Sequence, residues 1–209
     1  MKRRIAVAVA ALALSACAAP THQYINADAL GMYFALPASW TEVSNKQLAT
    51  AQQGWNDDAG NVFLQTKRWQ GAWSATPVDA NAVFTATPGN VPIVYAFVRD
   101  LISQEQQGIG TNVSAALRDL VLPATAIVDA GVPVEAERLK QAGFTGLRQT
   151  ATYVSGGAMQ TTEVVSMLNP QRSRVFVLVA RCSVRCFTNH ADEVRDIIDS
   201  LTFKESRGN

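Results

Sequence analysis

Two cysteines and one histidine stand four residues apart near the C-terminal end of the chain: Cys182, Cys186 and His190. Thiolates and imidazoles are zinc ligands, but these three groups leave a closed tetrahedral zinc site one ligand short. A redox-active pair usually has two residues between its cysteines, whereas three separate these. A structural disulfide and a pair of free thiols are the other interpretations, and the compartment of the protein decides between them.

The first seventeen residues have the order of a bacterial export signal. Three cations come first: Lys2, Arg3 and Arg4. The apolar run over residues 5–13 is too short to span a bilayer, which takes roughly 20 apolar residues. It ends in LSAC, which resembles the lipobox of bacterial lipoproteins, whose cysteine, here Cys17, receives a diacylglycerol and becomes the first mature residue. An ordinary secretory signal with a chance cysteine is the alternative, and either signal exports the protein.

A lipidated Cys17 is expected to fix the protein to a membrane. Each buried CH₂ contributes about 0.8 kcal/mol, so one acyl chain binds marginally and two or more hold firmly. Ala18 follows the cysteine, and a non-acidic residue there resembles the signal for delivery to the outer membrane. We expect a signal peptide at residues 1–16 and a lipidated cysteine with a tether at residues 17–27. The expected location is the outer side of a bacterial membrane, or the periplasmic face of the outer membrane if the host has two membranes.

Export also bears on the other two cysteines. Lipidation takes Cys17 out of the count of three, so Cys182 and Cys186 remain in an oxidising compartment, where a disulfide is the expected state. In an extended strand, residues four apart are separated by about 13 Å, whereas disulfide-bonded α-carbons lie about 4.4–6.8 Å apart. The chain must therefore turn between the two cysteines, and the bridge should stabilise the fold by about 2 kcal/mol.

The composition indicates one packed domain without a strongly charged partner. Hydrophobic residues make up 48% of the 209 residues, and we expect a single domain over residues 28–204 with a tail at residues 205–209. The net charge of +1 falls by three to −2 once the cations of the leader are removed. Nucleic acid is therefore not an expected partner.

The last third of the domain has the clearest pattern of elements. Residues 147–154 and 161–168 predict two strands joined by a two-residue turn at Gly156-Gly157. The run VFVLVA, residues 175–180, is apolar throughout, which is typical of a central strand covered on both faces. Three antiparallel strands are therefore predicted in sequence.

A helix is predicted after these strands. Apolar residues from Val194 to Leu201 fall at helical spacing, and Thr188 or Asn189 is the expected cap. Further strands are predicted at residues 32–36, 62–69 and 93–98, and further helices at 45–55, after Ser103, and at 113–121. Residues 70–91 are not assigned, and for residues 134–142 the composition favours a helix whereas the local context favours a strand. The pattern predicts an α+β fold, an α/β/α sandwich whose central, mainly antiparallel sheet is covered by helices on both faces.

Three stretches of this pattern resemble the PsbP-like fold, which is shared with the Mog-type Ran-binding factors. They are MYFALPASWTEV, GFTGLRQTATYVSGG, and VFVLVARC followed by ADEVRDIIDSLTF. The chain is most similar to the exported lipoproteins of the LpqN-like branch, over most of residues 30–203, and it departs most at residues 70–91. The resemblance implies this fold and an envelope location. Members mostly act as non-enzymatic binding or assembly factors, so it implies no catalytic residue and no cofactor.

Residues suited to catalysis are sparse. His190 is the only histidine inside the domain, and no nucleophile, base and orienting group fall into a recognisable order. Asp57-Asp58 is a lone acidic pair in a predicted turn. We therefore predict no catalytic site, no metal site and no cofactor.

Two features could support binding. Trp69 and Trp73 stand at the end of a predicted strand, where aromatic rings face either a partner or the core. Four arginines cluster around the last strand: Arg172, Arg174, Arg181 and Arg185. Arg181 and Arg185 are the candidate binding residues among them, because the final helix is predicted to begin near Arg185 and the N-terminus of a helix attracts anions. Ordinary solvated surface is the alternative for the arginines.

The leading hypothesis is a membrane-anchored, non-enzymatic binding or assembly factor with an envelope protein as partner. The second hypothesis is a carrier of a lipid or another apolar small molecule, which needs an apolar cavity between sheet and helix. The third is an unrecognised envelope enzyme, with His190 or Asp58 as its candidate residues.

Overall fold

The computed structural model describes residues 20–27, 30–85, 89–111, 113–114, 116–117 and 134–204. The predicted signal peptide and Cys17 lie outside these ranges, as do much of the helix predicted at 113–121 and the tail after residue 204. No helix within the described ranges is both long and apolar enough to cross a bilayer.

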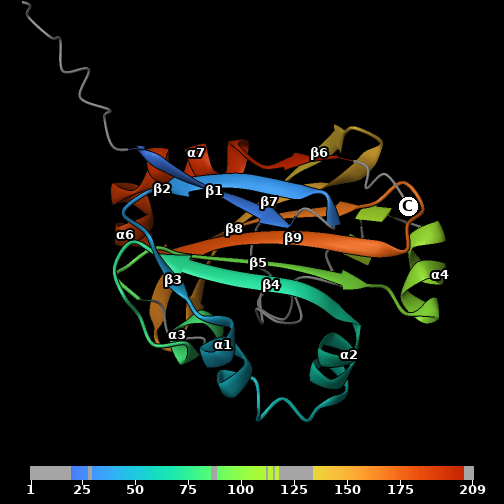
Figure 1. Cartoon of the computed structure of the whole chain (residues 1–209), viewed down its shortest axis with the longest axis horizontal. Helices are drawn as coiled ribbons and strands as arrows, with labels where there is room; N and C mark the ends of the chain where they lie inside the picture. The colour runs from blue at the N-terminus through green and yellow to red at the C-terminus, as the bar shows by residue number, and fades with distance from the viewer. Residues whose placement is uncertain are drawn as a thin grey trace, which may run out of the picture.

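A seven-stranded antiparallel sheet forms the centre of the fold (Figure 1). From edge to edge its strands are β3 (Thr41–Val43), β4 (Lys67–Ser74), β5 (Ile93–Asp100), β9 (Arg174–Ser183), β8 (Ala158–Leu168), β7 (Phe144–Ser155) and β6 (Val134–Gln141). The apolar run at residues 175–180 lies in the middle strand, as its pattern predicted. Gly156 and Gly157 form the predicted turn between β7 and β8, with positive φ angles of 57° and 81° that glycine adopts readily.

A second, three-stranded sheet consists of β1 (His22–Ala27), β2 (Met32–Pro37) and β10 (Thr202–Phe203), in the order β1-β2-β10. Residues 22–27 were expected in a flexible tether, and this expectation is wrong, because they pair with β2 along their whole length. The physical reason is that core-facing and exposed side chains alternate along this strand, which was not evident from the sequence. Ile25 and Ala27 turn toward the core, whereas Tyr24 is exposed.

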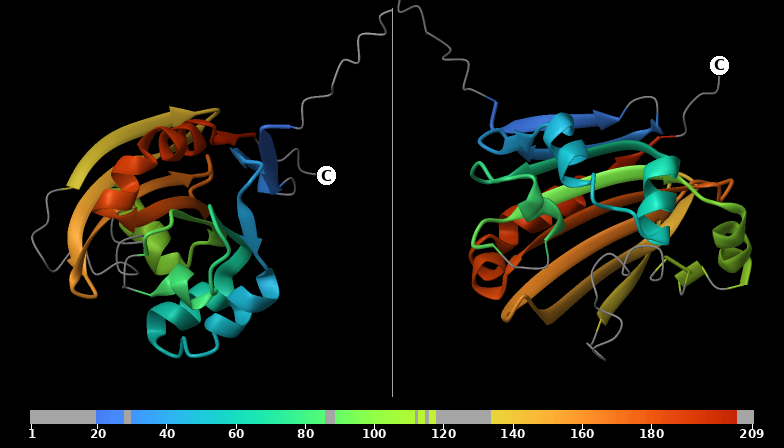
Figure 2. Two further views of the ribbon diagram at one scale, coloured as in Figure 1. Left: turned by 90° about the vertical axis from the view of Figure 1, so that its left-hand side faces the viewer. Right: turned by 90° about the horizontal axis from the view of Figure 1, so that it is seen from below.

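Helices cover both faces of the large sheet (Figure 2). One face, called the α2 face below, packs against α1 (Asn45–Ala51), α2 (Asp58–Thr66), α3 (Asn81–Phe84) and α4 (Ser103–Thr111). The other, called the α7 face, packs against α6 (Val184–Asn189), α7 (Ala191–Asp199) and the three-stranded sheet. The predicted α+β sandwich with a mainly antiparallel sheet is confirmed, and a small sheet shares one of its outer layers with helices.

The strand register sends alternate residues to the two faces. Leu178 and Val165 lie side by side on the α7 face, and Val177 and Ser166 lie side by side on the α2 face. The core on the α7 face extends to the end of the sheet where β9 begins. There the rings of Phe144, Phe176 and Phe203 lie 4.9–5.6 Å apart.

Local signals explain where the helices fall. The predicted cap at Ser44 is confirmed, and its side chain forms a capping box with Gln47. The strand predicted at residues 62–69 is wrong over its first five residues, which complete α2, and β4 begins only at Lys67. Asp57 accounts for this, since its Oδ1 accepts the N–H of Gly60 at 2.8 Å and caps α2.

The predicted cap of the last helix is also wrong. Thr188 and Asn189 belong to a separate short helix, α6, which Ser183 caps. His190 stands between α6 and α7 and makes no side-chain cap hydrogen bond. The unassigned residues 70–91 hold the end of β4 and the helix α3, and residues 134–141 form β6.

Candidate functional site

The two cysteines of the opening motif form a disulfide. Cys182 lies in β9 and Cys186 in α6, with their α-carbons 5.8 Å apart, and both side chains are buried. The chain turns at Ser183, as the disulfide geometry required. Among the described residues, no group of three or more His, Cys, Asp or Glu side chains is placed to hold a metal ion.

His190 takes part in a hydrogen-bonded chain beside α7. Its Nδ1 lies 2.7 Å from Oε2 of Glu193, and Oε1 of the same carboxylate accepts the indole N–H of Trp40 at 2.8 Å. Glu193 also borders a hollow of about 290 Å³ between β2 and α7. Because one oxygen of Glu193 contacts His190 and the other joins α7 to Trp40, the arrangement fits a structural role.

The tryptophan pair lies against the core. Trp73 is buried, with 3% of its surface exposed, and its ring meets Phe34 edge-on at 5.4 Å. Trp69 lies 6.2 Å from Trp73 and packs, partly buried, against the same core. The proposed binding surface is therefore wrong for Trp73, because the register of β4 turns this residue to the α7 face beneath the small sheet.

Arg181 and Arg185 do not share a surface either. Arg181 lies on the α2 face, where its Nη2 donates to the carbonyl oxygens of Ala82 and Val83 at 2.6 and 2.7 Å. Burial lowers the pKa of this guanidinium, against a smaller opposing effect of Tyr153. Arg185 lies in α6 and is exposed. Arg181 therefore fixes the end of α3 to β9.

A hollow of about 180 Å³ opens at the end of the sheet where β5 ends and β9 begins, and it is called the Arg174 pocket below. Its lining consists of Leu30, Phe144, Asn169, Pro170, Gln171, Arg174 and Phe176. The floor is apolar, because Phe144 and Phe176 belong to the aromatic cluster of the core. The polar groups come from the turn between β8 and β9 and from the first residue of β9.

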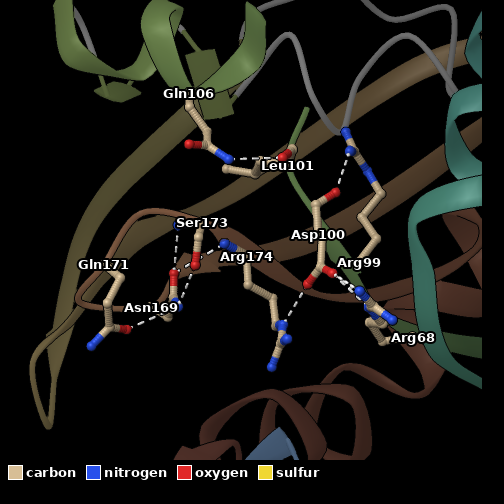
Figure 3. A network of polar contacts seen from close by, with 9 residues as sticks. All are labelled: Arg68, Arg99, Asp100, Leu101, Gln106, Asn169, Gln171, Ser173 and Arg174. Carbon is tan, nitrogen blue, oxygen red and sulfur yellow. Dashed lines mark hydrogen bonds and ion pairs between the residues drawn. The ribbon is translucent and has the colours of Figure 1, made fainter. Parts of the chain in front are cut away.

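Asp100, at the end of β5, holds Arg174 in place (Figure 3). The Nε of Arg174 donates to Oδ1 of Asp100 at 2.8 Å, and the Nε of Arg68 donates to Oδ2 at 2.5 Å. Burial alone would raise the pKa of Asp100, but the hydrogen bonds and charges of Arg68 and Arg174 outweigh it and hold the pKa below its usual value. The carboxylate therefore stays ionised, and the three groups together carry one positive charge.

The far end of the Arg174 side chain is free. Within the described residues, its Nη1 and Nη2 have no hydrogen-bond partner, and Figure 3 shows them pointing away from Asp100. The side chain is 29% exposed, so water or a ligand can reach it. A guanidinium in this state can donate two parallel hydrogen bonds to an anion.

The backbone of Arg174 is fixed by the side chain of Asn169. Its Oδ1 accepts the N–H groups of Ser173 and Arg174 at 2.9 and 3.0 Å, and its Nδ2 donates to Ser173 Oγ and Gln171 Oε1, both at 3.0 Å (Figure 3). This amide is therefore fully used inside the turn. The turn also holds Arg172 at a φ of 53°. The pocket lining thus combines one guanidinium, two amides and apolar groups, which suits binding rather than proton transfer near neutral pH.

Only part of this site was predicted from the sequence. Arg174 belonged to the arginine cluster, but nothing in the pattern singled it out from Arg172, and Asp100 was not among the candidate residues. The two partners are 74 residues apart, so only the pairing of β5 with β9 brings them together. Arg99-Asp100 at the end of a strong strand pattern was the one available clue.

A second polar group went unnoticed in the sequence. Gln149, Gln160 and Ser166 lie on the α2 face of β7 and β8, and each is at most 2% exposed. Both side-chain polar atoms of Gln149, Oε1 of Gln160 and Oγ of Ser166 have no hydrogen-bond partner among the residues that the structure describes. The strands predicted in this part of the sequence gave no sign of what surrounds these side chains.

The two hollows also bear on the lipid-carrier hypothesis, which needs an apolar cavity. Arg174 lines one of them, and Glu193 and Asp196 line the other. Neither hollow is lined by apolar groups alone, so neither favours that hypothesis.

No family model matches the chain, and no curated protein matches it. It is similar to the solved structure of LpqN, involved in cell envelope biogenesis of Mycobacterium tuberculosis, at 14% identity and a TM-score of 0.48 over 88% of this chain and 90% of that one. It is also similar to cyanobacterial PsbP from Synechocystis sp. PCC 6803, at 9% identity and a TM-score of 0.48 over 90% of this chain and 95% of that one. For the Ran-binding protein Mog1p of Saccharomyces cerevisiae the identity is 7% and the TM-score 0.46, over 88% of this chain and 96% of that one. These are the groups that the sequence resembles, and TM-scores below 0.5 carry no argument about ligand, partner or activity.

Proposed function

We propose that the protein is a membrane-anchored envelope lipoprotein that acts as a non-enzymatic binding or assembly factor, and that the Arg174 pocket holds part of its partner. One observation carries the proposal. The Arg174 guanidinium is held by Asp100, is free at its far end, and lines a hollow together with Phe144 and Phe176. Such a group recognises a complementary anion, and its lining offers no nucleophile or general base for catalysis.

The position of the pocket relative to the anchor supports a partner away from the lipid surface. β1 begins at His22, five residues after Cys17, so the lipid attachment point lies at most about 18 Å from the start of β1. β1 is about 20 Å long, and Leu30, just beyond its far end, lines the pocket. In Figure 1 β1 begins at the left of the domain, whereas α4 and the start of β9 lie at the right. The start of β1, to which the proposed anchor is connected, therefore lies at the end of the domain opposite the pocket.

Photo-crosslinking in whole cells tests the proposal. A benzophenone amino acid is placed at Gln171, an exposed residue on the pocket rim, in the full-length lipoprotein at native abundance. Asp192 is the control position, because its side chain is 93% exposed and lies on α7, away from the pocket. The proposal expects a discrete envelope product from Gln171 and not from Asp192. The same products from both positions, or none from Gln171, would contradict it.

The anchor is tested separately by fractionation. Replacing Cys17 with Ala should move the protein from the membrane fraction to the fluid fraction of the envelope, because the diacylglycerol has no other attachment point. Retention of this variant in membranes would contradict lipid anchoring at Cys17.

A further inference from the structure

We propose that the Arg174 pocket binds an organic carboxylate whose acid group is attached to an apolar body of about the size of one aromatic ring. This inference rests on the proposed binding function and names the chemistry of what is bound. The ligand carboxylate would meet Nη1 and Nη2 of Arg174, and its apolar body would fill the hollow that Leu30, Phe144 and Phe176 help to line.

The hydrogen-bonding geometry selects a carboxylate. Asp100 occupies the Nε side of the Arg174 guanidinium, so the edge left open is the pair of terminal nitrogens. These nitrogens present two parallel N–H groups, which match the two oxygens of a carboxylate. The amide of Asn169 does not compete, because its oxygen and nitrogen are bonded within the turn.

The charge balance favours a single negative group. Arg68 and Arg174 share one carboxylate, that of Asp100, which leaves one positive charge without a partner at the mouth of the pocket. Asp100 also prevents Arg174 from folding back to pair elsewhere. A ligand carboxylate would complete an alternating row of two guanidiniums and two carboxylates.

The floor and the volume select the apolar body. Four apolar residues, Leu30, Phe144, Pro170 and Phe176, line the hollow beside the polar groups of the turn, and the two phenylalanines are only 3% and 2% exposed. A cavity of about 150 Å³ holds benzene in another protein, and the hollow here measures about 180 Å³. Inorganic phosphate would reach the guanidinium but fill only part of the hollow and make fewer van der Waals contacts with its walls, so it should bind more weakly than an aromatic carboxylate.

Fluorine NMR of 4-fluorobenzoate with the full-length lipoprotein in non-ionic detergent tests the inference. 4-Fluorobenzamide is the matched probe, because it has the same shape without the charge. We expect line broadening and a saturable shift for the benzoate, and an affinity at least about tenfold lower for the benzamide, since a hydrogen bond to a charged group is lost. Equal binding of the two probes, or no benzoate binding up to about 10 mM, would overturn the inference.

Two variants locate the site. Arg174→Met should lower benzoate affinity at least about tenfold. Arg172→Met is the matched control, because Arg172 is exposed on the same turn and does not line the pocket, and it should leave the affinity unchanged. Equal losses in both variants would overturn the site. The comparison of benzoate with benzamide uses the unaltered protein, so the test holds even if Arg174→Met fails to fold.

Competition distinguishes the two sources of such a carboxylate. Displacement of 4-fluorobenzoate by N-acetyl-alanyl-phenylalanine, but not by its C-terminal amide, would identify the C-terminus of a polypeptide. Failure of the acid to displace the probe would identify a free carboxylic acid. A discrete crosslink from Gln171 without benzoate binding would refute the ligand class and leave the binding role standing.

Discussion

Replacing the buried Gln149 with Met should make the protein more stable. Gln149 is 2% exposed, and within the described part of the chain neither its Nε2 nor its Oε1 has a hydrogen-bond partner. A buried polar group without a partner costs about 1–3 kcal/mol. Methionine has the same unbranched length without the amide, and it adapts to irregular space. The free energy of unfolding should therefore rise by about 2 kcal/mol.

Gln160 offers a matched control on the same face of the sheet. It is 1% exposed, but its Nε2 donates to Tyr153 Oη at 2.7 Å and to Thr162 Oγ1 at 3.1 Å. Gln160→Met removes both hydrogen bonds, each worth about 1 kcal/mol, and also removes one unpartnered oxygen. The free energy of unfolding of this variant should fall by about 1 kcal/mol.

Urea denaturation followed by tryptophan fluorescence measures both changes, with the slope against urea expected to stay constant. In a domain of this size, a gain of about 2 kcal/mol corresponds to a rise in Tm of about 4–8 °C. A fall of more than about 1 kcal/mol in Gln149→Met would refute the reasoning. It would show that an internal water or another group pairs with the amide.

Reduction of the Cys182–Cys186 disulfide should lower the free energy of unfolding by about 2 kcal/mol through chain entropy alone, because the two cysteines are four positions apart. An unchanged urea midpoint under reductant would contradict this. Asp100→Asn should cost about 1 kcal/mol at pH 7, because two partly exposed ion pairs are lost. Since the folded pKa of Asp100 is lowered, its contribution is present above the unfolded value, near 3.8, and is lost as the pH falls through the folded value. The difference in the free energy of unfolding between wild type and Asp100→Asn should therefore vanish in strong acid. Asp192→Asn is the control, because the side chain of Asp192 is 93% exposed and its loss should change the free energy of unfolding little. A difference between wild type and Asp100→Asn that does not depend on pH would count against the Asp100 ion pairs. Gly71→Ala should lower Tm, at a cost of about 1–3 kcal/mol, because a β-carbon there would collide with the Trp73 ring. Gly110→Ala is the control, because a β-carbon at this position in α4 meets open space and alanine favours the helix, so Tm should rise slightly. Equal changes in Tm for the two variants would refute the packing argument.

The elements that were predicted correctly are those whose own residues determine their structure. The run at residues 175–180 is apolar on both faces because β9 has covered faces, and Ser44 is a sufficient cap on its own. The β7–β8 hairpin was predicted because two glycines supply the positive φ angles of its turn. In each case the residues that form the sequence pattern are the same residues that pack, cap or turn the chain in the structure.

Prediction failed where the deciding contact is distant or subtle. β1 (HQYINA) has only two core-facing apolar residues, and pairing with β2 rather than its own pattern makes it a strand. Residues 62–66 have strand-like composition, but the cap at Asp57 commits them to α2. Prediction of the candidate site failed because the deciding contact is distant: Arg174 acquires its role only when β5 brings Asp100 beside it.

The central claim is that Arg174 holds the partner, and its most direct test compares two arginines in living cells. The crosslinking residue stays at Gln171 while either Arg174 or Arg172 is replaced by Met, with equal amounts of each lipoprotein in the membrane. The account predicts that the partner product disappears with Arg174→Met and persists with Arg172→Met. Persistence of the product in both variants would contradict it.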